Sequence, residues 1–154
     1  MQSAELNDSE RILGDVLTRY ARAARDKDVD AFVALYSDDV RVFDAWDRWS
    51  YEGSVAWRAA VSGWFRSVGD DQIVVTVSDL RADVAGGVAF GHALVRHASV
   101  ADDGRELHAI LNRHTWGLTC LGGAWKIRHE HSSVPVSFAT HTAIAADEDR
   151  VSGG

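Results

Sequence analysis

The sequence is poor in cysteine and lacks any cluster of basic residues, and both features narrow what the protein can be. A single cysteine, Cys120, excludes an internal disulfide and fits a reducing compartment. The formal net charge is −7, and the 16 lysines and arginines are scattered against 23 acidic residues. Nucleic acid is therefore not expected as a partner, because phosphate binding needs a concentrated basic surface.

Long hydrophobic runs are also lacking. No apolar stretch approaches the roughly 20 residues of a membrane span, and the N-terminal MQSAELNDSERIL has no basic start followed by an apolar run, as a signal peptide would. We therefore expect a soluble, cytoplasmic protein. The length of 154 residues, without repeat or linker, predicts one domain (1–154) with an ordered core at roughly 7–138 and a frayed polar end.

Three helices are predicted in the first half of the chain, each after a capping residue. The three caps are Asn7, Asp28 and Ser54. In the first helix, Asn7 and Glu10 have the spacing of a capping box, and an apolar stripe that includes Tyr20 follows. The second helix is predicted to reach Tyr36, and the third carries Trp64 on its apolar face.

Most of the remaining sequence alternates apolar and polar residues with the period of two that is typical of strands. Strands are expected at 40–46, 73–81, 87–100, 105–120 and 124–134. Helices followed by an antiparallel meander predict an α+β fold with the helices on one face of the sheet. The long central strands further indicate a strongly twisted or bulged sheet.

The first of these strands brings a carboxylate towards the interior. If Val40 and Val42 face the core, Asp44 and Trp46 face it with them. An apolar cavity would raise the pKa of Asp44 towards the range useful for a general base. The alternative is that Asp44 lies at the strand mouth, where it is solvated or paired with an arginine.

The last strand ends in two histidines with the parity of the apolar Ile127. His129 and His131 are therefore expected to face a pocket, about 7 Å apart, where imidazoles can act as acid, base or donor. They could equally be core histidines that bond serine or backbone groups. A metal site would need a third ligand such as His114 or Asp44, and because no further ligand has motif spacing, no metal is expected.

The neighbouring strand offers three more polar candidates. Alternation allows either Arg113 or the pair Asn112 and His114 to face the pocket, and His114 is favoured because Trp116 shares its parity. Arg113 facing inward would suggest an acidic substrate group or a partner for Asp44.

Other candidates depend on strand phase. His92 and Arg96 share one face of strand 87–100, whereas His97 is expected at the surface with His108 and His141. Trp46 could stack on a planar ligand near the mouth, or pack against a second subunit. Trp64 has core spacing and is also a candidate for the pocket wall.

Two longer stretches carry a family resemblance. Residues 20–44, YARAARDKDVDAFVALYSDDVRVFD, and the closing AWKIRHEHSSVP resemble the nuclear-transport-factor-2-like superfamily, in its SnoaL-like and ketosteroid-isomerase-like branch. The second stretch is similar to the "GxWRIxHEHxSxP" ending of SnoaL-like members. The resemblance implies a cone-shaped fold in which a curved, mainly antiparallel sheet wraps three N-terminal helices around an apolar pocket, usually in a homodimer.

The same resemblance suggests site residues. In ketosteroid isomerases an aspartate at the inner end of the first strand is the base and a tyrosine on the first helix donates to the oxyanion. By position, Asp44 and Tyr20 correspond to these two residues. The third family residue, a protonated aspartate on the penultimate strand, is absent, since Asn112-Arg113-His114 occupies that region. This departure argues against a steroid isomerase proper.

We therefore hypothesise a cofactor-independent enzyme that performs acid/base proton transfer on a small apolar oxygenated molecule, giving isomerisation, dehydration or cyclisation. Asp44 would be the base, and Tyr20 with His129 or His131 would stabilise the oxyanion. The expected substrate contacts are Trp46, His114, Asn112, Arg113, His92 and Trp64. The alternative is a non-catalytic small-molecule-binding or dimerising association domain whose cavity is filled by side chains.

Overall fold

A computed structural model describes residues 6–145, which contain three helices and six strands. The helices are α1 (Asp8–Asp26), α2 (Val29–Val33) and α3 (Ser54–Val68). The strands are β1 (Tyr36–Phe43), β2 (Tyr51–Glu52), β3 (Gln72–Ala85), β4 (Val88–Val100), β5 (Glu106–Leu121) and β6 (Ala124–Ser133). The predicted α+β class is confirmed.

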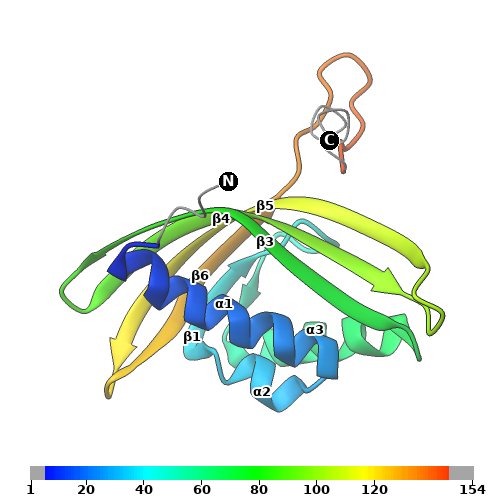
Figure 1. Cartoon of the computed structure of the whole chain (residues 1–154). Helices are drawn as coiled ribbons and strands as arrows, with labels where there is room; N and C mark the ends of the chain where they lie inside the picture. Colours follow the sequence, from blue (N-terminus) through cyan, green and yellow to red (C-terminus); the bar gives the residue numbers. More distant parts are fainter. Residues whose placement is uncertain (1–5, 146–154) are drawn as a thin grey trace.

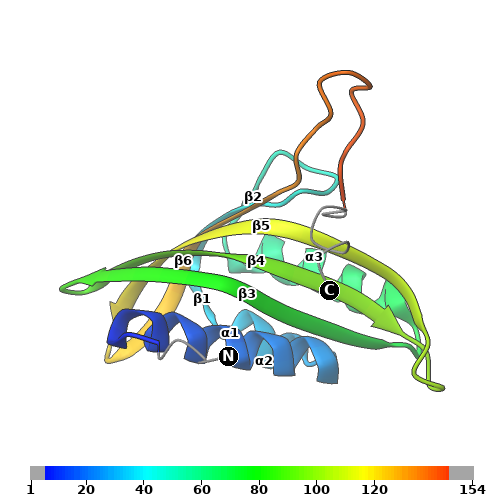
Figure 2. The same cartoon turned by 45° about the horizontal axis from the view of Figure 1, so that its top comes forward.

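The six strands form one sheet in the order β2-β1-β6-β5-β4-β3. Neighbouring strands are antiparallel, except that β1 and β6 run parallel. The sheet arches over the three helices, which all lie on its concave side (Figure 1). The C-terminal segment after β6 leaves the sheet on the opposite side (Figure 2). The prediction of a curved, mainly antiparallel sheet around the helices is therefore confirmed.

Helix α1 forms where its local sequence predicts it. The Asn7 side chain accepts a hydrogen bond from the Glu10 amide at 2.8 Å, and the Glu10 carboxylate accepts one from the Asn7 amide at 3.1 Å. Lys27 ends the helix in the left-handed conformation, with φ of 50°. The residues that α1 buries are Leu13, Val16, Leu17, Tyr20, Ala23 and Ala24.

Helix α1 packs closely against the sheet because β4 has a glycine beneath it. A Cβ atom at Gly91 would lie 2.2 Å from Leu13 Cδ2 and 2.9 Å from the carbonyl oxygen of Arg81. Any side chain at this position would therefore push α1 away from the sheet.

The structure differs from the predicted boundaries around β1 and β2. Helix α2 ends at Val33, and Tyr36 already belongs to β1, where it pairs with Ile127 of β6. The short strand β2 lies between the first predicted strand and the third predicted helix, where no strand was expected, and Gly53 rather than Ser54 is the N-cap of α3. The parallel β1–β6 pairing extends β1 towards its N-terminus, which no local pattern reveals.

A β-bulge reverses the alternation of β6 in its middle. The β5–β6 register passes from Gly117↔His129 to Leu118↔Ile127, so Arg128 is an extra residue. As a result Ile127 and Glu130 both face the helices, with exposed fractions of 0% and 2%. The prediction that His129 and His131 share the inner face of Ile127 is wrong, because the bulge places both on the outer face.

Two expectations concern the chain ends. The polar residues 146–154, predicted to be frayed, and residues 1–5 lie outside the described range. Residues 134–145 form an extended excursion held by a bridge between Val136 and Ala143. No helix within residues 6–145 is long and apolar enough to cross a membrane.

Candidate active site

Asp44 follows β1 directly and lies half-buried at the inner end of that strand. Ser132 on β6 donates a hydrogen bond from Oγ to Asp44 Oδ1 at 3.0 Å and accepts one from the Ala45 amide at 2.9 Å. Burial raises the pKa of the Asp44 carboxyl, and the hydrogen bond from Ser132 partly offsets the rise. The result is a carboxylate held in place without a cationic partner among its recorded contacts.

Tyr20 of α1 is buried and reaches across to β4. Its hydroxyl lies 3.0 Å from His97 Nε2, and the Asn112 amide nitrogen lies 3.3 Å from His97 Nδ1. Burial raises the pKa of Tyr20 well above its ordinary value, as do the nearby carboxyls of Glu130 and Asp44. The phenol therefore keeps its proton near neutral pH.

The hydrogen bonds of His97 assign its tautomer. Burial lowers the pKa of His97 to about 4, so the ring is neutral and has one donor and one acceptor nitrogen. With the Asn112 amide oriented as in the structure, Nδ1 accepts from it and Nε2–H donates to the Tyr20 oxygen. The hydroxyl hydrogen of Tyr20 then remains available for another acceptor.

His114 lies next to this chain on the inner face of β5. Its ring centroid is 5.7 Å from that of His97 and 5.2 Å from that of Trp116. Burial lowers the pKa of His114 to about 3, with smaller contributions from His97 and His131. Both His114 ring nitrogens and Asn112 Oδ1 are buried without a hydrogen-bond partner. Such atoms each cost roughly 1–3 kcal/mol unless a ligand or water satisfies them.

Glu130 is a further interior group that sequence reasoning missed. The Tyr36 hydroxyl donates to Glu130 Oε1 at 3.0 Å, and Trp116 Nε1 donates to the same oxygen at 2.8 Å. Burial raises the pKa of Glu130 to about 7, although both hydrogen bonds oppose the rise. No local signal distinguishes Glu130, because its inward orientation follows from the bulge at Arg128.

The structure confirms some predicted orientations. Asn112 and His114 face the interior rather than Arg113, and Tyr20 is buried with the core of α1. Trp64 is half-buried against the core, with its ring centroid 5.6 Å from that of His97.

Other predicted orientations are wrong. His129 and His131 lie on the outer face around the Phe43 ring, at centroid distances of 5.0 and 5.6 Å. The imidazole of His129 also bonds the Arg41 carbonyl oxygen through Nδ1 at 2.8 Å. These two histidines therefore do not reach Asp44 or Tyr20 from the pocket wall.

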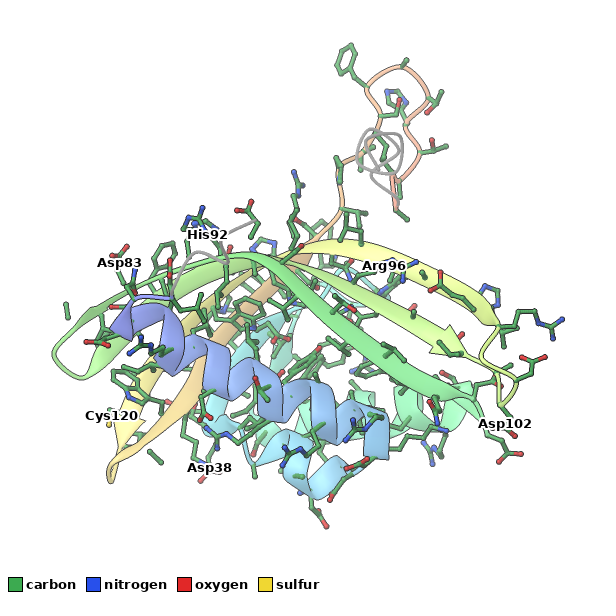
Figure 3. The ribbon with its side chains drawn as sticks, viewed as in Figure 1. Asp38, Asp83, His92, Arg96, Asp102 and Cys120 are labelled. Atoms are coloured by element: carbon green, nitrogen blue, oxygen red, sulfur yellow. The ribbon has the colours of Figure 1, made fainter. Side chains whose placement is uncertain are left out.

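Three further candidates also lie outside the interior. Arg113 is exposed and donates to Ser133 Oγ at 3.2 Å, because Asn112 and His114 occupy the inner phase of β5. His92 is exposed on the side of the sheet away from the helices (Figure 3). Trp46 is 54% exposed because β1 ends at Phe43 and the alternation ends with it.

His97 was expected at the surface and is instead an interior residue. The inner phase of β4 runs through the odd-numbered positions, so His97 lies inside and His92 and Arg96 outside. Arg96 instead forms an ion pair with Glu106 on the outer surface. The pairing of β4 with β3 and β5 sets this phase, which the sequence alone left undecided.

Together these side chains form an interior polar cluster of carboxyl, phenol, imidazole and amide groups. Its members are Tyr20, Tyr36, Asp44, His97, Asn112, His114, Trp116, Glu130 and Ser132. The buried residues of the described range include no lysine or arginine. Chemically, the cluster contains the half-buried carboxyl of Asp44 and neutral hydrogen-bond donors, and its members carry no fixed positive charge.

Two further features bear on binding. Within residues 6–145, no group of three or more histidine, cysteine, aspartate or glutamate side chains is arranged to hold a metal ion. Two grooves open on the surface, one between α2, β1 and α3 and the other between α1 and β3. Tyr36 lines the first groove, and no member of the interior polar cluster lines the second. Asp44, His114 and Glu130 line neither groove.

Comparison with known proteins identifies the family of this chain. Residues 13–137 match the model of the SnoaL-like domain. No curated protein matches the sequence. A solved NTF2-like protein of unknown function from Pseudomonas putida KT2440 is 29% identical, with a TM-score of 0.77 over 88% of this chain and 93% of that chain.

Two more distant structures share the fold. A candidate aromatic ring hydroxylase from Novosphingobium aromaticivorans is 17% identical, with a TM-score of 0.65 over 84% of this chain and 91% of that one. A candidate dehydratase of the NTF2-like family from Streptomyces avermitilis is 16% identical, with a TM-score of 0.69 over 82% and 96%. The predicted resemblance is confirmed, and because the family model spans most of the sequence, the chain belongs to the SnoaL-like domain family.

Proposed function

We propose that this protein is an enzyme that moves a proton on a small, largely apolar, oxygenated molecule bound in the interior polar cluster, without a cofactor. The observation that carries the proposal is Asp44, a half-buried carboxyl with a raised pKa and no cationic partner among its recorded contacts. A base of this kind removes a proton next to a carbonyl or alcohol, which begins isomerisation, dehydration or cyclisation alike.

Tyr20 supports the proposal as the donor to the developing oxyanion. With the Asn112 amide oriented as in the structure, the Tyr20 hydroxyl oxygen accepts from His97, so the Tyr20 hydrogen is available to a further acceptor. A donor preorganised in a low-dielectric interior stabilises charge as it develops, and needs no reorganisation during the reaction. Asn112 and His114 supply further polar contacts to the substrate through their unpartnered atoms.

The name of one distant relative agrees with this reaction class. One neighbour is named as a candidate dehydratase and another as a candidate aromatic ring hydroxylase. Below 25% identity such neighbours share the fold, and function depends on the residues that the fold positions. Of the two, dehydration is the chemistry that a carboxylate base and a phenolic donor can perform unaided.

A specific observation favours a second candidate function, that of a binding or association domain. The polar atoms of Asn112 and His114 are closed off from solvent, and neither residue lines either of the two surface grooves. In this alternative, side chains fill the interior and the protein performs no chemistry.

The test is solvent deuterium exchange into small cyclic ketones, followed by NMR. Exchange next to the carbonyl detects proton removal without requiring the natural substrate. Asp44→Asn should lower exchange by roughly 10²–10⁴-fold, the usual contribution of a positioned base. Asp38→Asn is the matched control, because it makes the same chemical change at an exposed position of β1.

Equal exchange by wild type and Asp44→Asn would refute Asp44 as the base. Absence of exchange with every ketone, together with absence of ketone binding, would favour the association domain.

A further inference from the structure

Glu130 is the only acidic residue classed as buried within residues 6–145, and its hydrogen bonds are unusual for a carboxylate. Both of its protein donors, the hydroxyl of Tyr36 and the indole of Trp116, are neutral, and both bond Oε1. A buried carboxylate normally has a cationic partner, because isolated charge is costly in an apolar interior. These surroundings therefore favour the protonated, uncharged acid.

The two hydrogen bonds also decide which oxygen carries the proton. Oε1 already accepts two hydrogen bonds, so the acid hydrogen belongs on Oε2. Within the described residues no side chain or amide donates to Oε2. Because Tyr36 and Trp116 come from strands on either side of β6, they hold the carboxyl group in a fixed orientation. Protonated Glu130 is thus a fixed donor with a hydrogen still to share.

The groups around Glu130 maintain this state. From β1 it meets Tyr36 and, further along, Asp44, whose negative charge disfavours a second charge at Glu130. From α1 it meets Tyr20, which stays protonated.

The remaining neighbours supply no positive charge either. On β5, Trp116 bonds Glu130 and also packs against His114, whose lowered pKa keeps the ring neutral. From α3, the ring of Trp57 packs against Tyr36 at a centroid distance of 5.9 Å. Asp44 is only half-buried and accepts a hydrogen bond from Ser132, whereas Glu130 is fully buried, so the charge is favoured at Asp44 and the proton at Glu130.

We infer that Glu130 contacts the ligand directly and donates a hydrogen bond from Oε2 to a carbonyl or hydroxyl oxygen of an uncharged molecule. The inference rests on the proposed function only in requiring a ligand within the interior polar cluster. It also names the ligand class. The negative charge of Asp44, with no buried lysine or arginine in the described residues to offset it, repels carboxylates and phosphates, so the ligand is a neutral ketone, aldehyde or alcohol.

The experiment measures binding of 2-tetralone, a neutral cyclic ketone, by quenching of tryptophan fluorescence between pH 6 and 8. Because Glu130 donates its proton to the ligand oxygen, only protein with protonated Glu130 should bind the ketone. The pKa of Glu130 is about 7. Wild-type affinity should therefore fall about tenfold from pH 6 to pH 8. The anion 2-naphthoate, of similar shape, should not bind at either pH.

Glu130→Gln is the decisive variant because glutamine imitates the protonated acid. Its Oε1 can still accept from Tyr36 and Trp116, and its amide nitrogen donates where Oε2–H did. This variant should bind 2-tetralone with the affinity of wild type at pH 6, and that affinity should not change with pH. The matched control is Glu52→Gln on β2, which alters an exposed carboxylate and should retain the wild-type pH dependence.

A second variant tests the inference independently, in case Glu130→Gln does not fold. Tyr36→Phe removes a hydrogen bond that favours the carboxylate, so the pH at which binding is half-lost should move upward. A purely structural role for Glu130 would not move this midpoint.

Several outcomes would overturn the inference. These are pH-independent binding by wild type, loss of binding in Glu130→Gln, equal binding of 2-naphthoate, or no binding of 2-tetralone at any pH. The proposed function fails separately, in the exchange assay. Loss of exchange in Asp44→Asn with pH-independent ketone binding would leave Asp44 as the base and remove Glu130 as a ligand contact. If ketone binding shows the expected pH dependence but no deuterium exchange occurs, Glu130 stays as a ligand contact and Asp44 is removed as the base.

Discussion

Replacing Glu130 with glutamine should change how folding stability depends on pH. The pKa of Glu130 in the folded protein is about 7, against an ordinary value of 4.5. Between these two values the folded state binds more protons than the unfolded state, so wild-type stability falls as pH rises through this window. At 1.36 kcal/mol for each pKa unit, the full loss is on the order of 3 kcal/mol above pH 7.

Glutamine does not titrate, so the variant should escape this loss. We would measure urea unfolding by tryptophan fluorescence at about pH 5 and about pH 8.5, for wild type and Glu130→Gln. The free energy of unfolding of the variant, relative to wild type, should rise by roughly 2–3 kcal/mol between the two pH values. Taking the difference removes most of the contribution of other titrating groups, since distant effects add.

A relative stability that stays constant between the two pH values would refute the reasoning, because it would mean that the folded state tolerates the Glu130 charge. Glu52→Gln again provides the control. Its side chain is exposed and its contact with Arg41 is 3.6 Å long, so it should contribute well under 1 kcal/mol at either pH.

Two further predictions concern stability and are checked by urea unfolding. Gly91→Ala should lower the free energy of unfolding by about 1–3 kcal/mol, because its Cβ would overlap Leu13. Gly63→Ala, in an open position of α3, should raise it by up to about 1 kcal/mol. Equal effects of the two substitutions would contradict the close packing of α1. His114 has a lowered pKa of about 3, so wild-type stability should fall as pH drops from about 6.5. His114→Leu should therefore gain relative stability on the order of 3 kcal/mol by about pH 4, and a pH-independent difference would show that the imidazole is not held neutral.

Local sequence patterns predicted the elements that depend on neighbouring residues. The capping pair Asn7 and Glu10 and the apolar stripe of α1 gave the first helix and the inward position of Tyr20. Alternation in β1 likewise predicted Asp44 on the inner side, where it bonds the buried Ser132, and parity with Trp116 placed His114 inside. These predictions held because helical and strand periodicities act over a few residues.

The chemistry of the interior was only partly predictable. Glu130 and His97 were missed, and His129 and His131 were placed on the wrong face. On β6 the cause is the extra residue Arg128, which moves every later side chain to the opposite face of the sheet. The roles of Asp44 and Tyr20 in catalysis remain predictions, for which the exchange assay is the test.

The sequence by itself determined the order of the three helices and the five longer strands, the α+β class and the family, because each follows from local periodicity and from recognisable stretches of the chain. Only the tertiary structure decided which polar side chains share the interior. The phase of a strand is set by hydrogen bonding to its neighbours, and β6 lies between β1 and β5, two strands distant from each other in sequence. A bulge in that pairing converts the outward glutamate of HEHSS into the buried acid of the site.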